Sequence, residues 1–353
     1  MAARYRQLAA ELRQLCLTLQ QQGQRKLPGE LALCEAYHCS RETVRHALAL
    51  LEEEGLVIRM HGSGTYLAGG PARGRRIAVV TADRDTYLYP QLLRDLERAF
   101  SAQGFSTAAI ATGGRVLAER AVLERLVAEP PAGILLEGAK SALPSPNLDL
   151  LARLGALGVP LVFLHASFPV PEGAPCIRDD NAGGAGMLTR YLLDKGHRHI
   201  AAVLKSDDQR GHERYEGFLA ALLQAGADVR EDSVFWFDTA QRDALIAGRD
   251  EWMYAFIRRR LPGCSAVVCY SDEIAYPLIH CLHAEGLRVP EDVAVVSFDN
   301  SYYCTAGPVS ITSLAHERHE LGSLAAGMLL DLIRARHVGD MQLPWTLRQR
   351  ESG

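Results

Sequence analysis

Short apolar segments alternate with amphipathic segments through most of the chain after residue 76. RIAVVTAD (76–83) and DVAVVSF (292–298) have the length and composition of buried strands, whereas QLLRDLERAFSAQG (91–104) repeats its apolar residues at helical spacing. Buried strands that alternate with helices indicate βαβ units, in which helices cover both faces of a parallel sheet. Roughly 275 residues of this pattern exceed one compact core, so we expect an α/β fold with two doubly wound, Rossmann-like lobes.

The same pattern identifies further strands, separated by helical stretches. They are expected at 105–112, 132–138, 159–165, 199–204, 233–237 and 265–271. NAGGAGM (181–187) opens a helix, and its glycine spacing differs from that of a GxGxxG dinucleotide loop. Close packing between helix and sheet therefore explains these glycines better than a nucleotide does.

The residues before this alternation follow a different pattern. Leucines at spacings of four, three and four, from Leu8 to Leu19, predict one helix, and LPGELALCEAY (27–37) begins a second. Ser40 is expected to cap a third helix, whose apolar face comprises Val44, Ala47, Leu48 and Leu51.

A hairpin is expected after the third helix. Gly55 supplies a left-handed stop, and LVIRM (56–60) and TYLAG (65–69) read as two strands with Gly62 and Gly64 at their turn. Three helices followed by a hairpin make a winged helix-turn-helix.

The boundary between the two patterns falls at AGGPARGRR (68–76), where glycine, proline and arginine are typical of a solvated linker. We expect a winged helix-turn-helix domain over residues 1–68, a linker over 69–75, and a two-lobed domain over 76–350.

Composition narrows the class of protein. The net charge is −4, yet residues 1–76 hold 11 Lys and Arg against 7 Asp and Glu, which favours a polyanionic partner for this end. No apolar run approaches the ~20 residues that span a bilayer, and the first residues lack the layout of a signal peptide. The eight cysteines form no CxxC pair. We expect a cytoplasmic protein with reduced thiols, no membrane partner, and no metal or other cofactor.

Two arginines mark a candidate site in the small unit. Arg41 and Arg45 lie one turn apart near the start of the third helix, and Thr43 lies at its exposed amino end. A helix-turn-helix presents these positions to base edges, where an arginine fork matches the two acceptors of guanine. The alternative is that both arginines only solvate a surface helix and pair with Glu42 or Glu52. The complete three-helix and wing layout favours DNA binding.

LPGELALCEAYHCSRETVRHALALLEEEGLVIRMHGSGTYL (27–67) resembles the DNA-binding domain of the GntR-type regulators. That family's pattern has Leu-Pro-Ser-Glu, Ser-Arg-x-Thr-Val-Arg, Leu-x-x-x-Gly-Leu and a wing that ends in Gly-x-Gly-Thr. The chain departs from it at Gly29, where a small hydroxyl residue is usual, and at Leu31, where arginine is common. The residues that the resemblance implies in DNA contact are Glu30, Arg41, Thr43 and Arg45, with His61 and Gly62 at the wing tip.

Polar residues follow several strands of the large unit. His165, Ser271 and Asp299 stand at or after strand ends, with Asp272 beside Ser271 and Arg214 in HERYEGF (212–218). Ligands of parallel sheets bind beyond the carboxyl ends of the strands, and such side chains suit a neutral polyol. Each residue also has a structural alternative, such as a helix cap or a loop tie. The candidates for an apolar wall are Tyr87, Tyr89 and Trp236.

Four stretches resemble the effector domain of the LacI/GalR repressors, which is similar to periplasmic sugar-binding proteins. They are residues 179–203, 213–222, 270–300 and 311–333. By this resemblance His165, Arg214, Ser271 and Asp299 fall on sugar-contacting positions, with Leu88 and Tyr89 on the pocket wall. His165 stands where aspartate is frequent, and Ser271 where asparagine is common. Both departures change the hydrogen bonds offered to an effector.

A GntR-type head on a LacI-type effector domain is similar to the arabinose-responsive repressors of Gram-positive bacteria, which makes L-arabinose a candidate effector. The expected protein is a homodimeric, sequence-specific transcriptional repressor that binds operator DNA and is controlled by a sugar or a related small metabolite. Ligand that weakens DNA binding is the commoner arrangement in the family, and a corepressor is the alternative.

Two other functions compete with this interpretation. An enzyme could use His165 as a base oriented by Asp299, but the sequence has no Walker loop, no nucleophile elbow and no dinucleotide fingerprint after a strand. We therefore predict no catalytic residues. A sugar sensor that acts through protein contacts, with a vestigial wing, is the third possibility, and the intact arginine pair argues against it.

Overall fold

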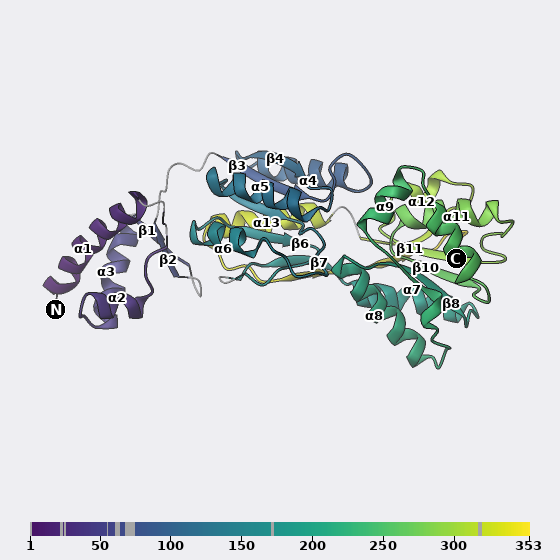
Figure 1. Cartoon of the computed structure of the whole chain (residues 1–353). Helices are drawn as coiled ribbons and strands as arrows, with labels where there is room; N and C mark the ends of the chain where they lie inside the picture. The colour runs from purple at the N-terminus through teal and green to yellow at the C-terminus, as the bar shows by residue number, and fades with distance from the viewer. Residues whose placement is uncertain are drawn as a thin grey trace.

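A computed structural model describes residues 2–21, 24, 26–54, 56–60, 64–67, 75–170, 173–316 and 320–353. Figure 1 shows a small amino-terminal unit at one end, a first lobe in the middle and a second lobe at the other end. Each of the three bodies has its own buried hydrophobic core, and the core of the first lobe consists of two clusters, one on each face of its sheet.

The amino-terminal unit is the predicted winged helix-turn-helix. Its elements are α1 (Ala2–Gln21), α2 (Glu30–Ala36), α3 (Arg41–Glu53), β1 (Val57–Met60) and β2 (Gly64–Leu67). Ser40 caps α3 by accepting a hydrogen bond from the backbone N–H of Thr43, and the predicted apolar face of α3 is buried. β1 and β2 pair antiparallel. Gly55 and the turn residues 61–63 lie outside the described residues.

The first lobe is a six-stranded, all-parallel sheet in the order β13-β7-β6-β5-β3-β4. α4 (Tyr89–Ser101) and α13 (Glu320–Ile333) cover one face, and α5 (Val116–Ala128) and α6 (Leu148–Ala156) cover the other. The strands are β3 (Arg76–Thr81), β4 (Ser106–Ala111), β5 (Gly133–Leu136), β6 (Leu161–Leu164), β7 (Cys176–Asp179) and β13 (Met341–Leu343).

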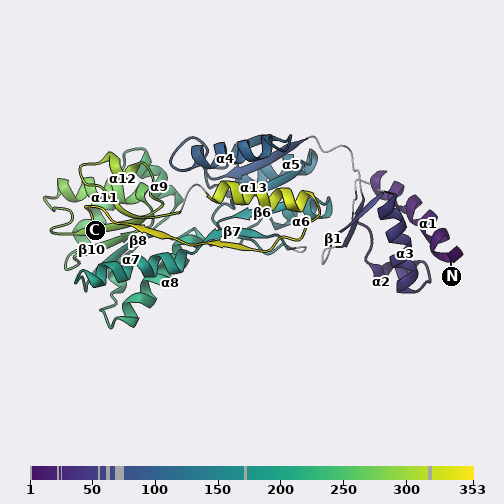
Figure 2. The same ribbon diagram turned by 180° about the vertical axis from the view of Figure 1, so that it is seen from behind.

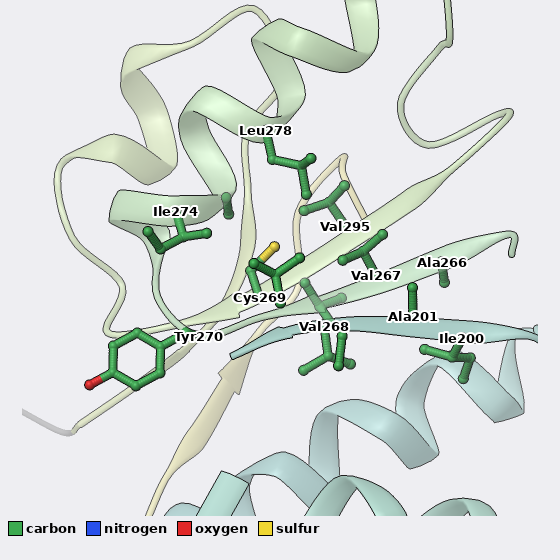
Figure 3. Close-up of a cluster of buried hydrophobic side chains, with 14 of the residues drawn as sticks. Ile200, Ala201, Ala266, Val267, Val268, Cys269, Tyr270, Ile274, Leu278 and Val295 are labelled. Carbon is green, nitrogen blue, oxygen red and sulfur yellow. The ribbon is translucent and has the colours of Figure 1, made fainter. Parts of the chain in front are cut away.

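The second lobe is a six-stranded sheet in the order β14-β12-β11-β10-β8-β9, in which β14 alone runs antiparallel. The strands are β8 (Ile200–Lys205), β9 (Val234–Phe237), β10 (Ala266–Cys269), β11 (Ala294–Phe298), β12 (Thr312–Ala315) and β14 (Thr346–Arg348). The helices are α7 (Asn181–Asp194), α8 (Gln209–Gln224), α9 (Thr239–Ile246), α10 (Glu251–Arg259), α11 (Asp272–Ala284) and α12 (Tyr303–Ala306). Figure 3 shows how Val267 and Val268 of β10 point to opposite faces of this sheet, where helices bury them.

The chain crosses between the lobes three times. It leaves the first lobe after β7, returns after β12, and leaves again between β13 and β14. Figure 2 shows the carboxyl-terminal segment passing from α13 along both lobes. Each lobe is thus assembled from segments far apart in the sequence, and the crossovers form the hinge between the lobes.

All eight predicted strands of the lobes are present, and NAGGAGM opens α7 as expected. The glycines there serve packing, because a Cβ added at Gly184 would lie 2.5 Å from Cδ1 of Trp345. Within the described ranges, no helix is long and apolar enough to cross a membrane. All eight cysteines are free thiols.

Candidate functional sites

The amino end of α3 presents two arginines to solvent. The side chains of Arg41 and Arg45 are 66% and 64% exposed, so both can reach a partner outside the unit. Nε of Arg41 lies 2.7 Å from one carboxylate oxygen of Glu30, and Nε of Arg45 lies 3.7 Å from the other. Glu30, at the start of α2, therefore orients both arginines.

Within the described residues, neither arginine forms an ion pair with Glu42 or Glu52, the partners that the surface-helix alternative proposed. Glu52 instead pairs with Arg59 of β1, at 3.6 Å. Thr43 keeps its hydroxyl 2.9 Å from that of Ser40, at the helix start. Gly29 caps α2 without a side-chain bond, and Leu31 is 68% exposed, so both family departures lie on the open surface. The two wing-tip residues, His61 and Gly62, lie outside the described residues.

A cleft between the lobes forms a cavity of about 150 Å³. It lies at the carboxyl ends of strands from both sheets, where the sequence predicted a ligand site. Seven predicted residues line it: Tyr87, Leu88, Tyr89, His165, Arg214, Ser271 and Asp299. A second, open hollow of about 420 Å³ lies against α6 and the end of α13, but its lining is mostly apolar and does not collect these polar groups.

Arg214 is the most deeply buried of the five cationic side chains in the cleft lining. Its side chain is 1% exposed, its Nε donates to Oδ1 of Asn181 at 2.9 Å, and its Nη1 donates to the carbonyl oxygen of Tyr270. The guanidinium carbon lies 3.9 Å from the ring centroid of Phe298. These contacts fix the planar fork beside Asp299, whose carboxylate is 3.9 Å away.

Four residues in the cleft lining have a left-handed backbone that non-glycine residues rarely adopt. The φ angles are 56° at Tyr87, 51° at Lys140, 67° at His165 and 95° at Asp299. Such conformations cost about 1–3 kcal/mol each and cluster at functional sites. The strain therefore marks the cleft independently of its residue types.

The charges of the cleft are balanced within the protein. Each of the five cationic side chains in the lining has a carboxylate partner at 3.9 Å or closer. The closest pairs are Lys140–Asp207 at 3.2 Å, Lys205–Asp207 at 3.6 Å, Arg210–Asp208 at 2.8 Å, Arg214–Asp299 at 3.9 Å and Arg242–Glu273 at 2.6 Å. Arg210 also lies 3.1 Å from Glu137, across the cleft. A neutral ligand leaves these pairs intact, whereas an anion has to break them.

Asp179 connects two histidines of the cleft. Its Oδ2 lies 3.3 Å from Nδ1 of His165, and its Oδ1 lies 2.9 Å from Nε2 of His316. Burial alone would raise the pKa of Asp179, but the two histidines outweigh it and hold the pKa well below the usual range. Burial would likewise lower the pKa of His316, but the nearby carboxylate of Asp179 outweighs burial and raises that pKa.

His165 is therefore oriented by Asp179 and not by Asp299, which corrects the acid–base pair of the enzyme alternative. Asp299 instead accepts a hydrogen bond from the hydroxyl of Tyr87, at 2.5 Å. Burial and the nearby carboxylate raise the pKa of Tyr87, so it stays a hydrogen-bond donor.

Two predicted effector residues do not line the cleft. Trp236 packs on the outer side of the second lobe, where its ring centroid lies 5.4 Å from His212 and 5.3 Å from Tyr215. Because side chains alternate along β9, Phe237 takes the buried side. Trp345, from the third crossover, supplies an aromatic side chain in the cleft.

Asp272 is the second exception, since its side chain is completely buried behind the cleft. It accepts hydrogen bonds from the backbone N–H of Ser301 at 2.6 Å, from Oγ of Ser313 at 2.7 Å, and from Oγ of Ser297. Its role is to tie α11 to the ends of β11 and β12.

Several cleft residues were missed by the sequence analysis. Glu137 and Lys205 follow or end strands that were predicted, so their position was a usable signal. Asp179, His316 and Trp345 belong to the crossovers, which have no local pattern.

A winged helix-turn-helix with exposed arginines, joined to two lobes that enclose a polar cleft, defines a ligand-responsive transcriptional regulator. Comparisons with known proteins agree with this class. Residues 4–67 match the bacterial regulatory proteins of the gntR family, and residues 189–353 match the periplasmic binding protein-like domain.

Full-length relatives share both parts. The arabinose metabolism transcriptional repressor of Geobacillus stearothermophilus is 31% identical over 342 residues, which cover 95% of this chain and 92% of that one. The protein of the same name from Halalkalibacterium halodurans is 30% identical over 316 residues, 87% and 83% of the two chains. The solved complex of the transcriptional regulator CelR with cellobiose has a TM-score of 0.68 and 27% identity, and covers 89% of this chain and 92% of its own. The chain belongs to the family of bacterial transcriptional repressors that join a GntR-type DNA-binding domain to a periplasmic-binding-protein-like effector domain.

Proposed function

We propose that this repressor binds operator DNA as a homodimer in the cytoplasm, and that a neutral monosaccharide in the interlobe cleft weakens this binding. The observation that carries the proposal is the charge balance of the cleft, in which every cation of the lining already has a carboxylate partner. A phosphorylated or carboxylated sugar would bring an unpartnered charge into this environment.

The size of the cleft supports a single sugar ring. Its cavity measures about 150 Å³. An engineered protein cavity of about 150 Å³ holds one benzene-sized ring. A disaccharide such as cellobiose, named with the solved relative, needs more space than this. Among single-ring sugars, L-arabinose is the first candidate because two relatives are named as repressors of arabinose metabolism.

Six residues carry the proposed contacts to the sugar. Arg214, Asp299, His165 and Ser271 offer donors and acceptors for vicinal hydroxyls, and Leu88 and Tyr89 wall one side. Tyr89 donates its hydroxyl to Glu137 at 3.1 Å, which leaves its ring face for the ligand. Asp272 and Trp236 have no place in this contact set, because one is buried behind the cleft and the other packs outside it.

The proposed DNA contacts are made by Arg41, Thr43 and Arg45 at the amino end of α3, with Glu30 holding the arginines. His61 and Gly62 would contact the backbone or minor groove from the wing. Two such heads in a homodimer would read two half-sites of a pseudo-palindromic operator. The names of the relatives, all transcriptional regulators, support a role without catalysis.

One experiment tests the ligand and the response together. The purified protein is titrated with L-arabinose, other pentoses, hexoses, cellobiose and a pentose phosphate, and its thermal midpoint and affinity for DNA from its own promoter region are measured. We expect L-arabinose to raise the midpoint and to weaken DNA binding, with the phosphate and cellobiose inactive. Tight binding of a phosphorylated sugar or of cellobiose would contradict the proposal, as would protein that ignores promoter DNA.

A further inference from the structure

The three chain crossovers between the lobes are connected by side chains. Asp179 ends β7 at the first crossover, His316 follows β12 at the second, and Trp345 lies between β13 and β14 at the third. Asp179 and His316 are more than a hundred positions apart, and α13 and β13 lie between His316 and Trp345. All three residues nevertheless meet at one point of the hinge.

His316 is the centre of this junction. Its Nε2 lies 2.9 Å from Oδ1 of Asp179, and its Nδ1 lies 3.1 Å from the carbonyl oxygen of Pro344. Its ring stacks on that of Trp345 with centroids 3.8 Å apart and an interplanar angle of 24°. One imidazole therefore contacts both of the other crossovers.

The junction is anchored on the second lobe. The ring of Trp345 packs edge-to-face on Phe298 of β11, with centroids 5.6 Å apart. It also lies against Gly184 at the start of α7, where any Cβ would collide with it. On the other side, Asp179 contacts His165 of the first lobe. The chain of contacts runs from one lobe to the other through His316.

The same four side chains, His165, Asp179, His316 and Trp345, line the cleft. A relative rotation of the lobes has to bend all three crossovers, so it changes the geometry of this junction. A ligand held by His165 reaches the junction through Asp179, and can favour one of its arrangements through differential contacts.

We propose that His316 is a positioning residue that links occupancy of the cleft to the arrangement of all three crossovers, and so transmits the effector signal toward the DNA-binding heads. This inference rests on the proposed function for the signal itself. The link between the crossovers rests only on the contacts above.

The test compares His316→Ala with wild type and with His283→Ala, an exposed histidine on α11 as the matched control. The first measurement needs no ligand: amide hydrogen exchange is followed in peptides that cover residues 176–182 and 343–348. We expect exchange there to rise at least tenfold in His316→Ala and to stay unchanged in the control. Unchanged exchange in both peptides overturns the proposal, whatever the ligand is.

The second measurement is the coupling factor, the ratio of the operator Kd values with and without saturating L-arabinose. We expect a factor of about 5 to 150 in wild type, the usual range, to fall toward 1 in His316→Ala while the variant still binds L-arabinose. Full coupling in the variant, or loss of L-arabinose binding by the folded variant, overturns the proposal. A wild type that does not respond to L-arabinose contradicts the proposed function and leaves the exchange result to decide this inference.

A variant that does not fold is replaced by His316→Gln, which can donate to Asp179 but cannot stack on Trp345. The same two criteria apply to it.

Discussion

The hydroxyl of Tyr87, in the first lobe, donates a hydrogen bond to the carboxylate of Asp299, in the second lobe, over 2.5 Å. The two residues are 212 positions apart, and both have a left-handed backbone. The ring of Tyr87 also faces Tyr303 of the second lobe, with centroids 6.0 Å apart. With Arg210–Glu137 and Lys140–Asp207, this contact fastens the two lobes across the mouth of the cleft.

Tyr87→Phe should lower the affinity for the effector, because the contact stabilises the closed arrangement that surrounds a ligand. A hydrogen bond to a charged group is worth about 1.5–3 kcal/mol, so we expect binding to weaken at least tenfold by calorimetry. Tyr254→Phe, on α10 outside the cleft lining, serves as the control. Affinity equal to or tighter than that of wild type would show that Tyr87 does not support closure.

Arg41→Ala and Arg45→Ala should each weaken operator binding by ~1–3 kcal/mol and relax base choice, because each removes a fork that can pair with guanine. Fluorescence anisotropy with promoter DNA measures this. Arg6→Ala, an exposed arginine on α1, controls for the loss of one positive charge. If all three variants bind promoter DNA with the affinity of the wild type, α3 does not read the operator.

Glu30→Gln should lower the discrimination between operator and other DNA, an effect that charge alone does not predict. Removing a negative charge near DNA favours binding, but both arginines lose the carboxylate that orients them. We expect sequence discrimination to fall while nonspecific affinity rises. Titrations with operator and scrambled DNA separate the two terms, and unchanged discrimination would mean that Glu30 does not orient the arginines.

Arg214→Lys should abolish the thermal shift caused by the effector while DNA binding persists. Lysine keeps the charge but cannot reproduce the fork that reaches Asn181 and the carbonyl oxygen of Tyr270. The free energy of unfolding of this variant, measured with urea, should also be lower by about 2 kcal/mol, because one buried hydrogen bond to a charged group is lost. A normal effector shift in this variant would remove Arg214 from the contact set.

The buried carboxyl group of Asp272 should make the free energy of unfolding depend on pH. Burial and the neighbouring Asp299 raise its pKa to about 6, above the value of an unfolded carboxyl group. Between about pH 4 and pH 6 the folded protein holds this proton more tightly than the unfolded chain, so the contribution to stability falls as the pH rises. Relative to Asp272→Asn, wild type should lose about 3 kcal/mol over this range, as measured by urea unfolding. A difference that does not change with pH would contradict the raised pKa.

The head domain could be predicted almost completely from the sequence. The leucine stripe of α1, the cap at Ser40 and the two strands of the wing are all local patterns, and each element formed where its pattern predicted it. The family pattern also named the exposed face of α3. The carboxylate that holds the arginines is different, because Glu30 is 11 residues from Arg41 and meets it only when α2 and α3 pack.

The cleft could be predicted in part. His165, Ser271 and Asp299 stand at strand ends, so the parallel-sheet rule was enough to bring them together. Trp236 does not line the cleft, because one residue of register along β9 decides which side of the sheet a ring faces. Asp272 is buried behind the cleft, because a carboxylate at the start of a helix can face either a ligand or the hydroxyl groups behind it.

By itself, the sequence determined the element types, the two kinds of domain and the strand ends that bear polar residues, since periodicity and capping act over a few residues. Only the tertiary structure decided how the chain passes between the lobes and which distant side chains share the hinge. The short strands β7, β12, β13 and β14 are stabilised by pairing with strands elsewhere in the chain, so no local signal marks them. The junction of Asp179, His316 and Trp345 exists because three such passages converge.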